Sequence, residues 1–322
     1  MKKELTIIAF FVALLTAGVL TPLIARFALR VGAKKIPKDE RHIHREPVAL
    51  LGGIAIYLGL AVGLLSVLIV RGQGLREVAP LLTCGAIILV WGTVDDLVDL
   101  RAGMKLIGQL AAASLAWWWG VRIEFLEKPF VGGYWYLETW ESYTMTVLWL
   151  IALTNAINLI DGLDGLAAGV SAIAAATLCV MAWQHRTQAE SLIVALVAAS
   201  LFGSALGFLR YNFNPAQIFM GDGGAQLLGF MLAAISVIGL SKSAAAVAIA
   251  APVLVFGVPV FDTSFAILRR LRNRQPIFSA DRGHLHHRLL DRGLSQKQVA
   301  MLIYLISCLL CATALLISAH AR

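Results

Sequence analysis

Long runs of apolar residues, separated by short polar segments, dominate the chain. Ten of these runs approach the ~20 residues that a helix needs to cross the hydrocarbon core of a bilayer. The expected spans are 5–29, 50–70, 79–94, 104–120, 143–157, 166–184, 191–209, 224–240, 244–267 and 299–319. The pattern predicts an all-α polytopic membrane protein with about ten transmembrane helices. Because no polar stretch is long enough for a soluble domain, we expect residues 1–322 to form a single integral-membrane domain.

Composition supports the same fold class. Apolar residues make up 59% of the 322 residues and charged residues only 14%, whereas soluble proteins average about 45–50% and about 25%. A soluble protein of this length would expose much of its apolar surface to water. The four cysteines all fall within the apolar spans, so a disulfide framework is not expected.

Lysine and arginine residues gather in alternate loops. If the spans alternate in direction, 18 of the 27 basic residues fall on one face, which carries the loops 31–49, 95–103, 158–165, 210–223 and 268–298. An excess of basic residues marks the cytoplasmic face, so both termini are predicted to lie outside. The net charge of +8 is mostly this asymmetry, and membrane lipid is its expected partner. Nucleic acid is not expected, because no soluble basic surface exists to bind it.

Aspartates gather on the same face. The chain has ten of them, and under this topology nine fall in the basic loops, while Asp262 lies near the same end of its span. Acidic residues at membrane depth are costly and usually functional. We therefore expect an active site formed by the cytoplasmic loops.

The motif VDDLVDL contains Asp95, Asp96 and Asp99. On a helix these three positions share one side, so two or three carboxylates can converge. Hard oxygen ligands of this kind select Mg²⁺ or Mn²⁺. The alternative is an exposed acidic helix end that binds no ligand.

The segment NAINLIDGLDG combines two amides with two carboxylates. Asn155, Asn158, Asp161 and Asp164 lie within ten residues, and the glycines among them permit a close, non-helical backbone. A polar turn between two spans is the alternative. Such a turn would not need this many carboxylates and amides, so we interpret the segment as part of a binding site.

A third motif contains Asp222, which lies between glycines at the start of the eighth span. The positive end of a helix dipole favours phosphate at such a place, although a simple N-cap would have the same appearance. Upstream, Asn212 adds an amide and Phe219 a stacking surface for a base.

A cluster of histidines and arginines follows the ninth span and consists of Arg282, His284, His286, His287 and Arg288. Three histidines could bind zinc, but the arginines would repel a cation. Binding of a diphosphate, or donation of a proton, fits this composition better. A smaller cluster in the first basic loop contains Arg41, His44 and Arg45.

Together these motifs predict a negative, metal-binding patch ringed by arginine and histidine on one membrane face. Phosphoryl transfer uses this arrangement, because catalysis there is mainly positioning and charge neutralisation. One substrate would be a lipid phosphate and the other a soluble, anionic donor. An ion-coupled transporter is the alternative from another class, but transporter carboxylates belong near the midplane.

Four motifs also resemble those of the bacterial polyprenyl-phosphate N-acetylhexosamine-1-phosphate transferases of glycosyltransferase family 4: NAINLIDGLDGLAAG, FMGDGGAQLLGF, VDDLVDL and ADRGHLHHRLL. The resemblance covers nearly the whole chain. It implies transfer of N-acetylglucosamine-1-phosphate (GlcNAc-1-phosphate) from UDP-GlcNAc to undecaprenyl phosphate, with release of UMP, as the initiating step of a cell-envelope polysaccharide. It also implies Mg²⁺ as cofactor, with Mn²⁺ as a substitute, and a cytoplasmic active site in the bacterial plasma (inner) membrane. The resemblance is compatible with either a monomer or a homodimer.

The resemblance further implies roles for individual residues. Asp95 and Asp96 would face the metal and the lipid phosphate, and Asp96 with Asp222 would bind the metal. His286 and His287 would contact the diphosphate as further catalytic residues. The expected substrate-binding residues are Arg41, His44, Asn155, Asn158, Asp161, Asp164, Asn212, Phe219, Arg282, His284 and Arg288.

Two details bear on the branch of the family. The sister enzymes that transfer phospho-MurNAc-pentapeptide have three adjacent histidines, whereas this chain has Arg288 at the third position. This difference favours the branch that transfers a simple amino sugar. The alternative is a phospho-MurNAc-pentapeptide transferase. The sequence does not determine which amino sugar is transferred. Ala49-Leu50 replaces a proline and a polar or basic residue of many relatives, so no detailed role is predicted for that loop.

Overall fold

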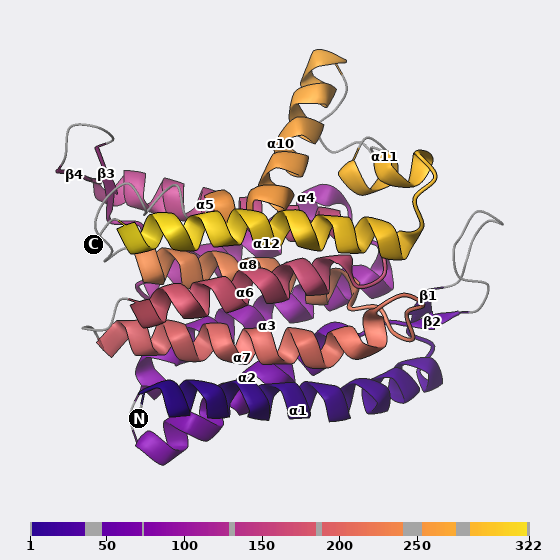
Figure 1. Cartoon of the computed structure of the whole chain (residues 1–322), viewed down its shortest axis with the longest axis horizontal. Helices are drawn as coiled ribbons and strands as arrows, with labels where there is room; N and C mark the ends of the chain where they lie inside the picture. Colours follow the sequence, from indigo (N-terminus) through magenta and orange to yellow (C-terminus); the bar gives the residue numbers. More distant parts are fainter. Residues whose placement is uncertain are drawn as a thin grey trace.

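Helices lying side by side form most of the molecule (Figure 1). The computed structural model describes residues 2–35, 47–72, 74–128, 133–184, 189–240, 253–274 and 284–320. Three residues of the predicted site, Arg41, His44 and Arg282, lie outside these ranges.

The helices, in chain order, are α1 (Lys2–Arg30), α2 (Gly52–Arg71), α3 (Leu75–Val98), α4 (Ala102–Trp118), α5 (Thr139–Ile160), α6 (Leu166–Gln184), α7 (Ala189–Asn212), α8 (Gly221–Leu240), α10 (Gly257–Arg272), α11 (Leu285–Asp291) and α12 (Gln296–His320). Two short antiparallel ribbons lie at opposite ends of the bundle (Figure 1). One pairs β1 (Lys34–Lys35) with β2 (Val48–Ala49), and the other pairs β3 (Phe125–Glu127) with β4 (Tyr134–Tyr136).

Eight helices of the described residues are long and apolar enough to cross a membrane: α1, α2, α3, α5, α6, α7, α8 and α12. Each coincides with a predicted span. The helix α4 matches the predicted span 104–120, but its 17 residues fall short of the ~20 that a straight crossing needs. The prediction of an all-α polytopic membrane protein is confirmed.

The predicted span 244–267 differs from the structure. Residues 241–252 lie outside the described part of the chain, and the rest belongs mainly to α10, which leaves the bundle and runs crosswise to its helices (Figure 1). Pro259 has no N–H to donate to the carbonyl of Val255, so a helix through this point loses a hydrogen bond and a new helix begins at Gly257. The last turn of α10 carries three arginines, unlike the interior of a span.

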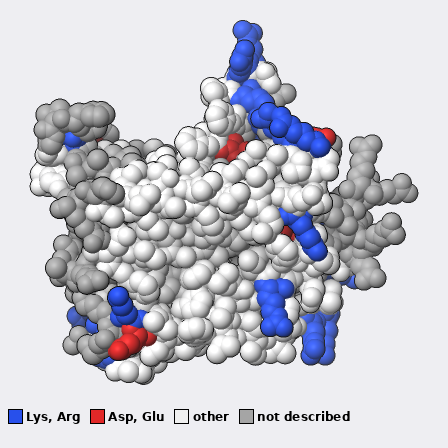
Figure 2. Space-filling view, viewed as in Figure 1, with Lys and Arg blue, Asp and Glu red and all other residues white. Residues whose placement is uncertain are grey.

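An uncharged band separates two charged ends of the bundle (Figure 2). Within this band α1 exposes large apolar side chains, including Phe11, Leu15 and Val19. Such a surface is stable against lipid but not against water. By contrast, α8 is almost wholly buried and packs against α2, α3, α5, α6 and α7. It is therefore the central helix of the bundle.

Close backbone contacts seat the start of α8 between α2 and α3. A methyl group added to Gly53 of α2 would lie 2.5 Å from the Cα of Gly224, and one added to Gly92 of α3 would lie 2.5 Å from the Cα of Gly223. Small residues of this kind let helix backbones approach closely. Asp222 directly precedes these two glycines, so the packing brings it against the end of α3.

The start of α1 and the end of α12 lie at the end of the bundle opposite the predicted motifs. This is the end away from α11 and the β1–β2 ribbon (Figure 1). The β3–β4 hairpin lies at this same end and exposes Tyr134, Trp135 and Tyr136. Exposed aromatic side chains of this kind are typical of the membrane–water interface.

Replacing Gly223 with alanine should push α8 away from α3. The new methyl group would meet Thr93 Oγ1 at 2.8 Å and the carbonyl oxygen of Leu89 at 2.9 Å. Relieving the second contact requires a shift of the helix backbone, which costs free energy. We expect a loss of about 1–3 kcal/mol in stability, measured as a lower Tm of the detergent-solubilised protein. In the control Gly18→Ala the methyl group would meet nothing within 4 Å. Equal Tm values for the two variants would contradict the packing described here.

Candidate active site

The predicted carboxylates lie at helix ends. Asp95 and Asp96 belong to the last turn of α3, which continues beyond the predicted boundary to Val98, and Asp222 belongs to the first turn of α8. The expectation that loops form the site is therefore wrong for these three residues, because the helices extend into the motifs. The structure brings all three together, whereas Asp99 is exposed at the end of α3.

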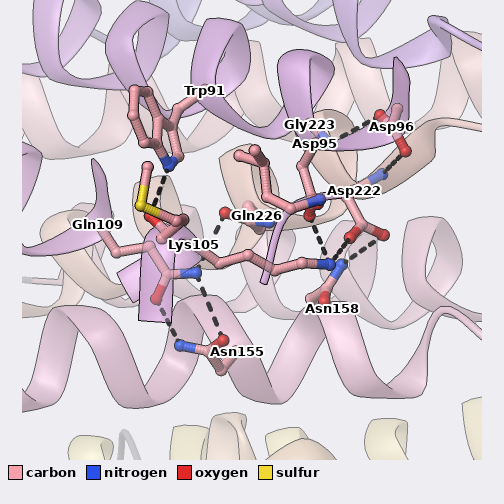
Figure 3. Close-up of polar contacts among 12 residues, drawn as sticks. Trp91, Asp95, Asp96, Lys105, Gln109, Asn155, Asn158, Asp222, Gly223 and Gln226 are labelled. Carbon is pink, nitrogen blue, oxygen red and sulfur yellow. Dashed lines mark hydrogen bonds and ion pairs between the residues drawn. The ribbon is translucent and has the colours of Figure 1, made fainter. Parts of the chain in front are cut away.

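Asp96 caps the first turn of α8 from the neighbouring helix. Its Oδ1 accepts a hydrogen bond from the backbone N–H of Asp222 at 2.7 Å, and its Oδ2 accepts one from Gly223 at 3.2 Å (Figure 3). The first N–H groups of a helix have no partner within the helix and carry partial positive charge. The Asp96 carboxylate accepts hydrogen bonds from these N–H groups and balances their positive charge. A metal ion bound by Asp96 would have to share its oxygens with the two N–H groups.

Lys105 joins the two remaining carboxylates. Its Nζ lies 2.6 Å from Asp95 Oδ2 and 3.1 Å from Asp222 Oδ2. Asn158, at the end of α5, donates from Nδ2 to Asp222 Oδ1 at 3.2 Å (Figure 3). Four helices thus contribute to one cluster, in which every carboxylate has a positive or hydrogen-bond-donating partner.

A pocket of about 260 Å³ opens beside this cluster. Predicted site residues form about half of its lining, namely Asp96, Asp161, Asp164, Asn212, Phe219 and Asp222. Lys35 and Gln296 also line it and were not predicted. Charged and polar groups from distant parts of the chain therefore surround one cavity, as a site for a small anionic ligand requires.

Two lining residues hold the backbone of the pocket. Asp164 Oδ2 accepts hydrogen bonds from Asn214 Nδ2 at 2.9 Å and from the Ala216 N–H at 3.0 Å. Asn212 Oδ1 accepts one from the Gly165 N–H at 3.1 Å, and its Nδ2 donates to the Ile218 carbonyl at 2.9 Å. Both side chains are buried. They tie the loop before α6 to the loop before α8.

The segment around Ala49-Leu50 joins the pocket through its backbone. The Phe219 N–H donates to the Ala49 carbonyl at 2.8 Å, and the Gly52 N–H donates to the Phe219 carbonyl at 3.0 Å. A methyl group on Gly52 would lie 2.8 Å from this same carbonyl oxygen. Because these contacts use main-chain atoms, they do not depend on the side chains by which this segment departs from many relatives.

The histidine motif packs onto the loop that carries Asp161. His286 Nε2 would lie 2.5 Å from a methyl group added to Gly162, so glycine makes room for the imidazole. Desolvation by burial, together with the charge of His287, lowers the pKa of His286 to about 4. His286 is therefore neutral at pH 7 in the free protein and available as a hydrogen-bond donor.

Asp262 holds this motif in place. Its Oδ2 lies 2.9 Å from His284 Nδ1, and its Oδ1 accepts a hydrogen bond from the Leu285 N–H at 2.8 Å. The rings of His284 and His286 stack with centroids 5.8 Å apart, and those of His286 and His287 lie 4.3 Å apart. Arg288 is exposed on α11. The structure thus gathers the three predicted histidines.

Asp161 lies in the same low-dielectric region. Desolvation and the charge of Asp222 raise the pKa of its carboxyl to about 7, although Lys35 acts in the opposite direction. Two nearby carboxylates in a poorly hydrated site repel each other. A cationic ligand at this point would relieve the repulsion.

The cluster fits a divalent cation. Asp95 and Asp222 converge on the single ammonium group of Lys105, which therefore occupies a place where a metal ion bound by both would lie. Among the described residues no group of three or more metal-binding side chains is preassembled. A metal ion would then take further ligands from water and phosphate, as Mg²⁺ prefers.

Several residues of the site carry only weak sequence signals. Lys105 could have been found as the basic second residue of the predicted span 104–120, which follows VDDLVDL, and Asp262 as the single aspartate placed within a span. Lys35 lies in the basic loop 31–49, and Gln296 lies three residues before the predicted span 299–319. Neither belongs to a motif, so only the folded chain identifies them. Asn155 lies one turn deeper than Asn158 and bonds to Gln109 (Figure 3).

Comparison with known proteins agrees with this geometry. A family model described as glycosyl transferase family 4 matches residues 78–240. A Bacillus subtilis protein named probable undecaprenyl-phosphate N-acetylglucosaminyl 1-phosphate transferase is 41% identical over 93% of this chain and 81% of its own length. A Mycobacterium leprae decaprenyl-phosphate N-acetylglucosaminephosphotransferase is 38% identical over 94% and 81%.

The sister branch is also represented. A phospho-N-acetylmuramoyl-pentapeptide-transferase of Desulforudis audaxviator is 31% identical over 94% of both chains. The similarity thus extends over nearly the whole chain and includes the helices that carry the carboxylates. The chain belongs to glycosyl transferase family 4, as its motifs predicted.

Proposed function

We propose that the protein transfers GlcNAc-1-phosphate from UDP-GlcNAc to undecaprenyl phosphate, giving a diphosphate-linked lipid sugar and UMP. The observation that carries this proposal is the convergence of Asp95, Asp222 and Lys105 beside a polar pocket at one end of a membrane bundle. Relatives named as transferases of this kind match nearly the whole chain. Carboxylates at the helix ends, rather than at the middle of the bundle, argue against an ion-coupled transporter.

Mg²⁺ is the proposed cofactor, with Mn²⁺ as a substitute. Asp222 and Asp95 would hold it, because both already converge on one cation. This changes the role expected for Asp96, which was predicted to bind the metal: both of its oxygens accept hydrogen bonds from the start of α8, so Asp96 would fix that helix end beside the ion. The ion supplies charge neutralisation on the diphosphate. Lys105, released from the carboxylates, would then be free to bind a phosphate oxygen.

The acceptor would reach the cluster from the lipid. Leu97 and Val98 follow the two carboxylates at the end of α3, and Met104 and Ile107 flank Lys105 in the sequence of α4. All four are exposed apolar residues. An apolar surface beside a charged cluster suits an isoprenoid chain that ends in phosphate. The phosphate would lie near Lys105, with its oxygen as the nucleophile.

The donor would occupy the pocket. Phe219 offers an aromatic face to the uracil, and Lys35 a positive charge to the diphosphate. His286, neutral and packed on Gly162, would donate a hydrogen bond to the same diphosphate, with His287 beside it. Asn212 and Asp164 would shape the pocket by holding its backbone.

The remaining contacts stay predictions. Arg41, His44, Arg282 and Arg288 are expected to add positive charge around the diphosphate, in agreement with the family resemblance. The face that carries the site is proposed to be cytoplasmic, where a soluble nucleotide sugar is available. The 41% identity with a relative named for GlcNAc, against 31% with one named for phospho-MurNAc-pentapeptide, supports the amino-sugar branch.

The bond that breaks gives the most direct test. Purified protein is supplied with undecaprenyl phosphate, Mg²⁺ and UDP-GlcNAc labelled in the β-phosphate. We expect the label in the lipid and UMP as the nucleotide product, because the lipid phosphate attacks the β-phosphorus. A donor labelled in the α-phosphate is the control, and its label should leave with UMP. Release of UDP together with an unlabelled lipid would refute the proposal.

Asp222→Asn tests the metal. The amide keeps the shape but removes the charge, so we expect kcat to fall at least about 100-fold and Mn²⁺ binding, measured by electron paramagnetic resonance, to weaken. Asp99→Asn is the matched control, since Asp99 is an exposed acid of the same motif in a left-handed backbone that asparagine tolerates. If both variants bind Mn²⁺ like the parent protein, Asp222 is not a ligand.

Sidedness is tested with single cysteines in a cysteine-free background. Arg101→Cys lies at the site end of the bundle, and Tyr136→Cys lies in the β3–β4 hairpin at the other end. A membrane-impermeant maleimide should label position 136 in intact cells and position 101 only after the membrane is opened. Labelling of position 101 from outside would place the site on the outer face.

A further inference from the structure

Three amide side chains lie directly beneath the carboxylates, toward the middle of the bundle. Gln109 belongs to α4, Asn155 to α5 and Gln226 to α8. Gln109 and Gln226 are only 2% and 1% exposed. Polar groups in the interior of a membrane protein are costly unless they are hydrogen-bonded. The pocket lining described above does not include these residues, so contact with the donor does not explain them.

Gln109 bonds to both Asn155 and Gln226, and we call these three linked amides the triad (Figure 3). Gln109 Nε2 donates to Gln226 Oε1 at 3.1 Å and to Asn155 Oδ1 at 3.3 Å. Asn155 Nδ2 donates back to Gln109 Oε1 at 2.7 Å and also to the Ile151 carbonyl at 2.8 Å. Side-chain hydrogen bonds therefore tie α4, α5 and α8 together at a single level.

Each amide lies one helical turn from a residue of the site on its own helix. The pairs are Lys105 with Gln109, Asn158 with Asn155, and Asp222 with Gln226. Residues three or four apart lie on the same helix face. Two layers result, about one 5.4 Å turn apart. The amides bond to one another in the deeper layer, and the site residues bond to one another in the layer above.

We infer that Gln109, Asn155 and Gln226 are positioning residues whose triad sets the height and rotation of three helices, and thereby places the metal- and phosphate-binding groups one turn above. This inference rests on the proposed function. It also changes the role of Asn155, which was expected to bind substrate. Its side chain acts through α5 and the triad instead.

Amides suit this role because hydrogen bonds are directional. Apolar contacts between helices tolerate small slides, whereas a slide of part of a turn would break the triad and leave donors and acceptors unpaired in a dry interior. Amides are also uncharged. They can therefore hold the helices without changing the charge of the carboxylate cluster.

Packing holds α4 firmly on its other side. The indole of Trp91 on α3 lies against Gly108, where a methyl group would overlap the ring. Trp91 Nε1 also donates to the Met104 carbonyl at 3.1 Å. The triad adds the connection from α4 to α5 and α8, which carry Asn158 and Asp222.

The test uses three variants of the full-length protein and one matched control. Gln109→Met and Gln226→Met remove one partner each with little change in shape, and the double variant removes both. Ser236→Ala is the control, because Ser236 Oγ accepts a hydrogen bond from Trp149 Nε1 at 3.0 Å between the same helices α5 and α8, fourteen residues beyond Asp222. Turnover, Mn²⁺ affinity by electron paramagnetic resonance, and Tm are measured for each.

Each single variant should lower kcat about 10- to 100-fold, because small misplacements of reacting groups are costly, and weaken Mn²⁺ binding about 10-fold. Each should also lower Tm, since a buried amide loses its partner. In the double variant Tm should lie above that of Gln109→Met, because no unpaired Gln226 oxygen is left. It should stay below that of the parent protein, because Asn155 still lacks its partner Gln109. Turnover should stay at the level of the single variants, since the residues act as a unit. Ser236→Ala should lower only Tm.

Two results would overturn the inference while leaving the proposed function intact. One is a kcat of the double variant that rises above that of Gln109→Met together with Tm, which would make the triad purely structural. The other is parent-like kcat and Mn²⁺ affinity in both single variants. A parent protein that forms no labelled lipid would instead refute the proposed function, and the inference with it.

Discussion

The close approach of glycine backbones at the start of α8 is the constraint on which the site depends. Gly223 and Gly224 pack against Gly92 and Gly53 with no room for a methyl group between them. At this separation Asp96 can reach the first N–H groups of α8. The carboxylate thus satisfies a helix end that would otherwise be buried without partners. A larger side chain at these positions would separate the helices that carry the acidic residues.

Charge at this end of the bundle is balanced by three different means. Asp96 is neutralised by the positive end of a helix, Asp95 by the ammonium of Lys105, and Asp222 by the same ammonium together with the amide of Asn158. A carboxylate without such a partner would be costly in a region of low dielectric. The neutral amide layer beneath separates this charged layer from the apolar interior, where only packing is required.

Residues that share one motif have different tasks. Asp161 lines the pocket with a raised pKa, whereas Asp164 is occupied by the backbone before α8. Asn212 likewise ties two loops together. Two residues hold His286 in place. Asp262 contacts the neighbouring His284, and Gly162 has no side chain that would collide with the His286 ring. Much of the polar sequence of the site therefore maintains the shape of the cavity.

The apolar pattern of the sequence by itself determined the fold class and eight spans, because the length and hydropathy of a segment decide whether it crosses a bilayer. It also determined the common end of the acidic motifs, since alternating helices return to the same face. It could not place α10, whose direction depends on packing after Pro259. Only the tertiary structure decided that Lys105 and the Gln109–Asn155–Gln226 triad belong with Asp222, because these contacts join helices more than forty residues apart and leave no periodic signal in the chain.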